Sequence, residues 1–249
     1  MWDRVVLKEN AKMALSGDKY WRAFAVCLIN SLIVNMFSLS ESFSTKGIDL
    51  LSPKSVFENV VSFHWYTIPA ILLFIFIGLP LIVGVSRFFL ANRFGQTDIG
   101  IMFTGFTDSY SSTITGMLTT ALIVFLCSLA LIIPGIVEGL KYTMVPFILA
   151  DNPTMPGDRA RQISSMMTNG EKGEIFVLYL SFFGWFLLAG IVLSLFSWLL
   201  WPIASLASIA ASAMIFAYQK ATFTELYIFM RDRIIRCGAV SPAEFGKIA

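Results

Sequence analysis

The amino-acid sequence predicts an all-α protein that crosses a membrane as a polytopic bundle of six transmembrane helices, arranged as three hairpins in one domain over residues 1–249. Composition is the first observation: 57% of the residues are hydrophobic and 14% are charged, whereas about a quarter are charged in a soluble domain. The second is an excess of aromatic residues, with 23 Phe, 6 Trp and 7 Tyr. The polar residues are too few to cover a water-soluble globule, so lipid has to cover the apolar surface.

Six apolar segments are the third observation, since a helix needs about 20 mostly apolar residues to cross the hydrocarbon. The segments are residues 20–38, 67–90, 113–133, 136–150, 175–200 and 203–229. Only Pro134 and Gly135 separate the third from the fourth, and only Trp201 and Pro202 separate the fifth from the sixth. Proline lacks a backbone donor and disfavours helical geometry in the preceding residue, so both pairs predict tight hairpin turns. A continuous helix kinked at proline is the alternative in each case.

The distribution of basic residues predicts how the chain is threaded. Six spans place both termini on one side of the membrane, and of the 18 Lys and Arg residues only Lys46 and Lys54 lie on the other side. Lys141 and Lys220 lie within spans, and all the remaining basic residues lie on the side of the termini. Because basic loops stay in the cytoplasm, we expect a multipass plasma-membrane protein with cytoplasmic termini and a cytoplasmic tail, residues 230–249.

The external loop, residues 39–66, is flanked by aromatic residues that suit the outer headgroup level. Phe63–Tyr66 precede the second span, and Trp198 and Trp201 end the fifth. Within the loop, Ser52 is followed by proline and by apolar residues at helical spacing. This pattern predicts a short helix that lies on the outer surface.

Three cytoplasmic stretches share a design in which a short interfacial amphipathic helix leads into a hairpin. These stretches are residues 2–16, 98–110 and 157–167. Asp98 is a good N-cap for the second helix, and each helix would lie in the inner interface with its apolar side toward the lipid. The first and third enter the next span through similar phrases, Gly17-Asp18-Lys19 and Gly170-Glu171-Lys172. Three such units predict a pseudo-threefold bundle.

Small and polar residues indicate how the spans pack against one another. Asn30 and Asn35 are polar residues in the first span, and we expect them to face the bundle and to hydrogen-bond there. In the sixth span Ala204, Ser208 and Ser212 recur every four residues. Such a stripe lets helix backbones approach closely, so the sixth span is expected to be central.

Glu138 and Lys141 stand three residues apart in an otherwise apolar run. At this spacing they share a helix face and can form an ion pair, which lowers the cost of placing either residue in lipid. The structural interpretation is an interfacial ion pair that fixes the depth of a short span. The functional interpretation is a polar step on a solute or proton path, since charges within the membrane often mark such paths. Pro146, which predicts a kink in the same span, is compatible with both.

Two further charged residues lie near the predicted inner surface. Asp151 is followed by Asn152 and Pro153, which is typical of a helix end and turn; an acid paired with Arg87 or Arg93 is the alternative. Lys220 is predicted to extend its ammonium group to the inner headgroups.

No pattern typical of an enzyme, a metal site or a cofactor site occurs. The three cysteines form no CxxC motif, and His64 is the only histidine, so no disulfide framework, metal site or nucleophile with a histidine base is predicted. Phosphate-binding glycine motifs are also absent. We therefore expect no catalytic residues and no cofactor. Because the basic residues are explained by topology, the expected partners are the lipid bilayer and its anionic headgroups, and no nucleic acid.

Several stretches resemble a family of uncharacterised multipass integral membrane proteins of Gram-positive bacteria. The stretches are IIPGIVEGLKYTMVPFILADNP, SMMTNGEKGEIFVLYLSFFGW, LKENAKMALSGDKYWRAF and PLIVGVSRFFLANRFG. The resemblance covers nearly the whole chain and implies a bacterial plasma-membrane protein with no established activity and no catalytic residues. A fainter similarity is to the membrane domain that accompanies some glycerophosphodiester phosphodiesterases. The chain departs from the family pattern at DNPTMPGDRARQISS, which has an extra Pro-Gly and fewer acidic residues.

Two functional hypotheses follow from these observations. The first is a non-enzymatic protein that organises, supports or senses the membrane, or is an accessory subunit of a membrane complex. Such a protein would bind another membrane protein or a second copy of itself. The second is a small secondary transporter or permease with a path between the hairpins, past Asn30, Asn35, Glu138 and Lys141. A lipid-headgroup hydrolase ranks third, because no nucleophile and base pair is available.

Overall fold

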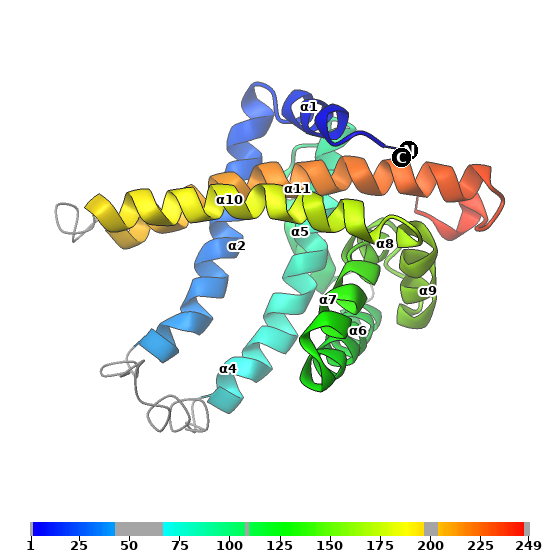
Figure 1. Cartoon of the computed structure of the whole chain (residues 1–249), viewed down its shortest axis with the longest axis horizontal. Helices are drawn as coiled ribbons and strands as arrows, with labels where there is room; N and C mark the ends of the chain where they lie inside the picture. Colours follow the sequence, from blue (N-terminus) through cyan, green and yellow to red (C-terminus); the bar gives the residue numbers. More distant parts are fainter. Residues whose placement is uncertain (1, 43–66, 108–109, 197–203, 247–249) are drawn as a thin grey trace.

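The computed structural model describes residues 2–42, 67–107, 110–196 and 204–246, and all regular structure in these ranges is helical (Figure 1). The α-helices are α1 (Arg4–Ala14), α2 (Asp18–Ser42), α4 (Thr67–Leu73), α5 (Leu79–Arg93), α6 (Tyr110–Ala130), α7 (Ile132–Lys141), α8 (Val145–Asp151), α9 (Gly157–Thr168), α10 (Lys172–Phe196) and α11 (Ala204–Arg236). A π-helical turn, η1 (Phe74–Gly78), joins α4 to α5, and η2 (Ile99–Phe106) and η3 (Pro242–Glu244) are 3₁₀ helices. The predicted all-α class is confirmed.

Four helical runs in the described residues are long and apolar enough to cross a membrane. The runs are Ile71–Arg93, Tyr110–Ala130, Ile132–Asp151 and Lys172–Leu195. Long apolar helices of this kind are typical of a multipass membrane protein. The other two predicted spans correspond to α2 and α11, which are long helices but are not among these four.

The longest helix, α11, lies at the centre of the assembly and contacts α1, α2, α5, α9 and α10. Figure 1 shows α10 and α11 side by side across the view, with α2 and the α4–α5 run leading away from them. Toward α2, α11 presents Ala213, Ala217 and Ala221, which are buried with Ala23 and Cys27. Small side chains at four-residue spacing let two backbones approach closely. The small residues of α11 that are buried with α2 are therefore Ala213, Ala217 and Ala221, and the predicted stripe was Ala204, Ser208 and Ser212.

The second predicted span is continuous, but it contains a π-helical turn. The Leu79 N–H donates to the carbonyl of Phe74, five residues earlier, and Pro80 follows at the start of α5. Proline supplies no N–H of its own and clashes with the carbonyl four residues before it, so the wider turn accommodates it.

The turn between α6 and α7 differs from the prediction. The chain breaks at Leu131, whose backbone is extended (φ −158°, ψ 141°), and Pro134 and Gly135 lie inside α7. Proline is tolerated in the first turn of a helix, where its missing N–H would have no partner. Gly135 is needed for packing, because a Cβ there would overlap Ser128 Oγ and lie 2.6 Å from Ser128 Cα. The prediction of a hairpin turn at Pro134 and Gly135 was therefore wrong.

The fourth predicted span, residues 136–150, lies within the candidate run Ile132–Asp151, which contains a turn between two helices. α7 ends at Lys141, and after a short turn α8 begins at Val145, with Pro146 in its first turn. In a continuous helix the Pro146 ring would meet the carbonyl of Tyr142, so the proline starts a new helix instead of kinking an existing one.

The three predicted amphipathic segments are helical but pack against other helices. α1 buries Leu7 and Ala11, and α9 buries Ala160 and Ile163. The second segment is the 3₁₀ helix η2, capped by Asp98, whose side chain accepts from the Gly100 N–H. It lies close against α5: a Cβ on Gly84 would overlap the carbonyl of Met102, and one on Gly105 would overlap that of Pro80. Most of each predicted apolar face therefore contacts protein, whereas Phe103 and Met166 remain exposed.

Several predictions concern residues outside the described ranges. They are the loop beyond Ser42, the outer helix from Ser52, the aromatic residues at 63–66, Trp198, Trp201 and the turn at Pro202.

Candidate functional site

The predicted polar residues group into separate places in the fold. Asn30 is buried in α2, and Asn35 lies in the same helix with its side chain outside the described part of the chain. Glu138 and Lys141 lie on α7, Asp151 ends α8, and Lys220 is on α11.

Glu138 and Lys141 form an ion pair on one face of α7. Lys141 Nζ donates to both Glu138 carboxylate oxygens at 3.1 and 3.0 Å, and it lies 4.9 Å from the centre of the Tyr142 ring. About a quarter of each side chain is exposed. The hydroxyl groups of Ser164 and Thr168 on α9 donate to the Lys141 carbonyl at 2.7 and 3.3 Å. The last carbonyls of a helix have no partner within it. The two hydroxyl groups provide one for Lys141, and these hydrogen bonds hold the end of α7 against α9.

Asp151 forms a buried cluster with two residues of α11. Its Oδ2 accepts a hydrogen bond from Tyr227 at 2.8 Å and one from Arg231 Nη1 at 3.3 Å. Asp151 is 2% exposed and Arg231 is 7% exposed. The positive charge of Arg87 also stabilises the Asp151 carboxylate. Arg93 pairs with Glu225 instead. A buried carboxylate requires such partners. Arg231 was not among the predicted partners of Asp151, because the two residues are 80 positions apart and no local pattern relates them.

Lys220 lies within the helix assembly. Its Nζ is 5.3 Å from the centre of the Phe147 ring and 5.4 Å from that of Phe216. The ammonium group is also close enough to Cys27 of α2 for an electrostatic interaction. Rings at these distances attract an ammonium group. Lys220 therefore packs near rings of α8 and α11. That its ammonium group extends to the inner headgroups stays a prediction.

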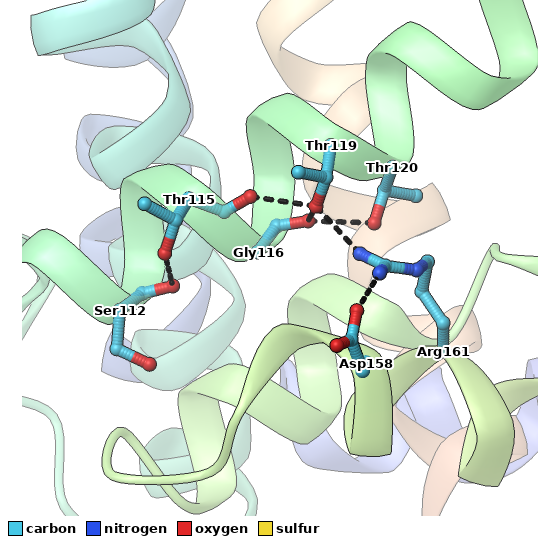
Figure 2. A network of polar contacts seen from close by, with 7 residues as sticks. All are labelled: Ser112, Thr115, Gly116, Thr119, Thr120, Asp158 and Arg161. Carbon is cyan, nitrogen blue, oxygen red and sulfur yellow. Dashed lines mark hydrogen bonds and ion pairs between the residues drawn. The ribbon is translucent and has the colours of Figure 1, made fainter.

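A ladder of hydroxyl groups on α6 receives an arginine from α9 (Figure 2). Thr115, Thr119 and Thr120 donate to carbonyls one turn earlier in α6 at 2.7–2.8 Å. Thr119 Oγ1 also accepts from Arg161 Nη1 at 2.5 Å, and Arg161 pairs with Asp158. Hydroxyl groups satisfied by their own helix can lie on a membrane span. None of these residues was predicted as a site, although Ser and Thr are frequent in residues 111–120.

The helices α6 and α9 also touch at glycines. A Cβ built on Gly157 would overlap Gly116 Cα, and one built on Gly116 would lie 3.2 Å from Gly157 Cα. Ser112 Oγ donates to the carbonyl of Met155 at 3.0 Å just before this contact. The two helices are therefore held at backbone distance along the stretch that positions Arg161.

Charged contacts tie the first residues to the start of α10. The Trp2 indole donates to Glu171 at 2.7 Å, and Arg233 pairs with the same carboxylate and donates to the Met167 carbonyl at 2.8 Å. The two glycines of the repeated phrases, Gly17 and Gly170, have φ of 67° and 79°. Glycine adopts this left-handed conformation readily, so the shared phrase marks the same kind of turn before α2 and before α10.

One protein family matches most of the chain. The sequence pattern of one family, described as a protein of unknown function (DUF975), matches residues 11–233. The chain belongs to the DUF975 family. No match was found among curated proteins or among solved structures. Membership agrees with the resemblance to an uncharacterised family, while the bacterial origin stays a prediction.

The DUF975 match ends before the C-terminal segment, residues 237–246, which folds back onto α8 and α9. Val240 and Phe245 are buried there, and Asn152 Nδ2 donates to the Glu244 carbonyl at 2.9 Å. Arg159 donates to both Glu244 oxygens at 2.7 and 3.0 Å. These hydrogen bonds lower the pKa of Glu244 and raise that of Arg159. The predicted tail, residues 230–249, thus begins as the end of α11, which continues to Arg236, and its next residues dock onto α8 and α9. Its cytoplasmic location stays a prediction.

Two cavities lie against α11 in the described structure. One, of about 400 Å³, lies between α1 and α11 and includes Trp2, Asn10 and Glu225. The other, of about 440 Å³, lies between α10 and α11 and is lined by aromatic side chains.

The described residues contain no group of three His, Cys, Asp or Glu side chains that could hold a metal ion. The cysteines are free, with Cys27 buried and Cys237 exposed. The expectation of no cofactor remains a prediction from the sequence.

Proposed function

We propose that the chain is a non-enzymatic multipass protein of the bacterial cell membrane. Its cytoplasmic helices sense or organise the membrane, or support a membrane complex. It has six spans in three hairpins, with α2 and α11 as the first and last, and both termini are cytoplasmic. The long apolar helices and the asymmetric placement of Lys and Arg support this arrangement, because basic residues are retained on the cytoplasmic side.

The main support for the proposal is that α1 has one face buried in the protein and an opposite face exposed. One side buries Leu7 and Ala11 in the protein. The other leaves Val5, Val6 and Met13 at least half exposed, beside the exposed basic residue Lys12. Exposed apolar and basic side chains on a short helix favour binding to an anionic membrane surface.

Contacts of α1 with α10 would carry such binding into the spans. Lys8 Nζ donates to Ser181 Oγ at 2.9 Å and lies 5.0 Å from the centre of the Phe182 ring. Burial lowers the pKa of Lys8, and the nearby charges of Arg4 and Lys12 lower it further. Arg4 also pairs with Glu174 at 3.8 Å. A shift of α1 on the membrane surface would therefore move the cytoplasmic half of α10.

The contacts of Glu138 and Lys141 favour the structural interpretation over a transport path. The two charges offset each other, and the Lys141 carbonyl is bonded to α9. Flux in liposomes distinguishes the hypotheses: a transporter would show solute or proton flux that is sensitive to Glu138→Gln. We expect no such flux across a broad solute panel.

Hydrogen exchange of the full chain in vesicles tests the proposal. Protection of α1 amides should increase when anionic lipid is added to neutral lipid. Lys12→Glu should remove most of this increase, because each basic residue contributes about 1 kcal/mol near an anionic surface. Arg236→Glu makes the same charge change at an exposed site on α11 and should preserve the increase. Equal α1 exchange in both lipids would contradict the proposal, whereas a partner recovered by cross-linking through α1 would favour the accessory role.

A further inference from the structure

The C-terminal segment, residues 237–246, turns back from α11 and covers the end of α8. The reversal occurs at Gly238, whose φ of 69° lies in the left-handed region that glycine adopts readily. At the other end of the segment, a Cβ on Gly246 would overlap the carbonyl oxygen of Asp151 and lie 3.2 Å from its Oδ1. The segment is therefore packed directly against the last residue of α8.

Water has little access to Asp151 while the segment is docked, because only 2% of this residue is exposed. Its Oδ2 accepts from Tyr227 and Arg231, whereas Oδ1 is buried and has no hydrogen-bond partner among the described residues. A buried oxygen without a partner is costly, and water would supply the partner. Water would also weaken the attraction between Asp151 and Arg231, since charges attract less in a medium of high dielectric constant. Removal of the segment should therefore loosen α8 from α11.

Two ion pairs near this contact differ in their exposure to solvent. Arg159 donates to both carboxylate oxygens of Glu244 at 2.7 and 3.0 Å, and about one-third of each side chain is exposed. The side chains of Asp151 and Arg231 are 1% and 9% exposed. Dissolved salt screens exposed charges and screens buried pairs much less. A rise in ionic strength should therefore weaken the attachment of the segment without acting directly on the buried pair.

We propose that residues 237–246 are a strap that responds to ionic strength. The strap covers Asp151 in dilute salt and detaches in concentrated salt, and its detachment loosens α8 from α11. Val240 and Phe245 are buried in the docked strap, so their burial opposes detachment and sets the salt concentration at which it occurs. The proposal is independent of lipid binding by α1. An exposed ion pair thereby controls a buried one.

Hydrogen exchange of the full chain in neutral detergent tests the proposal. Exchange is measured in about 0.01 M and about 1 M KCl, between which the screening length falls from about 30 to about 3 Å. Residues 148–151 and 227–231 provide the junction amides. In the native chain the strap and the junction amides should both exchange faster in concentrated salt, by up to about fivefold, the largest change that such an exposed ion pair supports. Sucrose at equal osmolality should have no effect.

Three variants separate the strap from the rest of the fold. Glu244→Gln removes the exposed pair, so its strap should exchange rapidly at both salt concentrations and its junction amides should not respond to salt. Arg159→Glu combined with Glu244→Arg reverses the pair and should respond like the native chain. In Asp151→Leu combined with Arg231→Met the buried pair is absent. Its strap should still respond to salt, whereas its junction amides should not.

Several outcomes would overturn the proposal. The native strap would exchange equally at both salt concentrations, or it would detach while the junction amides stay protected. A native-like salt response of the junction amides in Glu244→Gln would assign the response to another ion pair, such as Arg4 with Glu174. A response to sucrose as large as that to KCl would assign it to water activity instead of screening.

Discussion

The contact of α6 with α7 and the contact of α8 with α11 use different chemistry in the same chain. Between α6 and α7, Gly135 sits directly against Ser128, and apolar residues around the turn, such as Ile132, remain three-quarters exposed. Between α8 and α11, the buried Asp151 meets Tyr227 and Arg231. The first contact depends on the lack of a side chain at Gly135, and the second on hydrogen bonds between polar and ionisable side chains.

The difference follows from the environment of each contact. Lipid provides no hydrophobic drive for one helix to bind another, so close backbone approach and dispersion hold α6 to α7. The junction of α8 and α11 is surrounded by protein, with Phe147 stacked on Tyr227 at 5.8 Å between ring centres. Charges can be paired there, but removal of either partner leaves the other buried. The two regions should therefore fail in different ways when they are mutated.

Asp151→Ala should cause the largest loss of stability. The substitution leaves Arg231 buried without its main carboxylate, which costs about 3 to 5 kcal/mol. Denaturant unfolding of the purified chain in detergent measures the change. The double variant Asp151→Leu with Arg231→Met removes both charges and should recover most of the loss. An unchanged unfolding midpoint for Asp151→Ala would show that the cluster does not hold α8 to α11.

Gly135→Ala should break the α6–α7 contact at lower cost. The added Cβ would overlap Ser128, so the helices must move apart, which costs about 1 to 3 kcal/mol. Gly139→Ala is the matched control on the same helix, because a Cβ there meets only Val124 Cγ1 at 3.8 Å, an ordinary contact. The same unfolding assay should separate the two variants. Helix propensity favours alanine over glycine at both positions, so a cost can come only from packing. Equal costs in the two variants would mean that the contact with Ser128 is not what holds α7 to α6.

The sequence predicts well what depends on composition along one helix. The fifth span is predicted at residues 175–200, and α10 runs from Lys172 to Phe196, because a long apolar run that follows charged residues is expected to form a helix in lipid. Asp98 was predicted as an N-cap and is one, because capping depends on neighbours a few residues away.

Contacts between distant residues could not be predicted in this way. Pro134 was predicted to mark a hairpin turn and Pro146 a kink, but both lie in the first turn of a helix, α7 and α8 respectively. Arg231 likewise could not be distinguished from the other basic residues of α11, because only the packing of α8 brings Asp151 to it.

Thr119→Val should weaken the attachment of α9 to α6. Arg161 would lose its acceptor on α6, and a hydrogen bond between helices in lipid contributes about 0.6 to 1.7 kcal/mol. Hydrogen exchange of α9 and the unfolding midpoint measure the effect. Thr115→Val is the control, since that hydroxyl bonds only within α6. Equal effects of both variants would mean that the hydroxyl ladder, and not Arg161, is responsible.

Acidification should release the C-terminal segment with the smallest change in free energy. Hydrogen bonds from Arg159 lower the pKa of Glu244 in the folded chain. Their stabilisation is complete above the ordinary glutamate pKa of about 4.3 and is lost as pH falls through the lowered value. The pair is about one-third exposed, so at most about 1 kcal/mol is involved.

Hydrogen exchange of residues 237–246, corrected for the intrinsic pH dependence, should rise below pH 4 in the native chain. Glu244→Gln should show high exchange at every pH, whereas Glu174→Gln, which alters a pair with Arg4 on α1, should behave like the native chain. A segment that stays equally protected at low pH would mean that Val240 and Phe245 hold it without the ion pair.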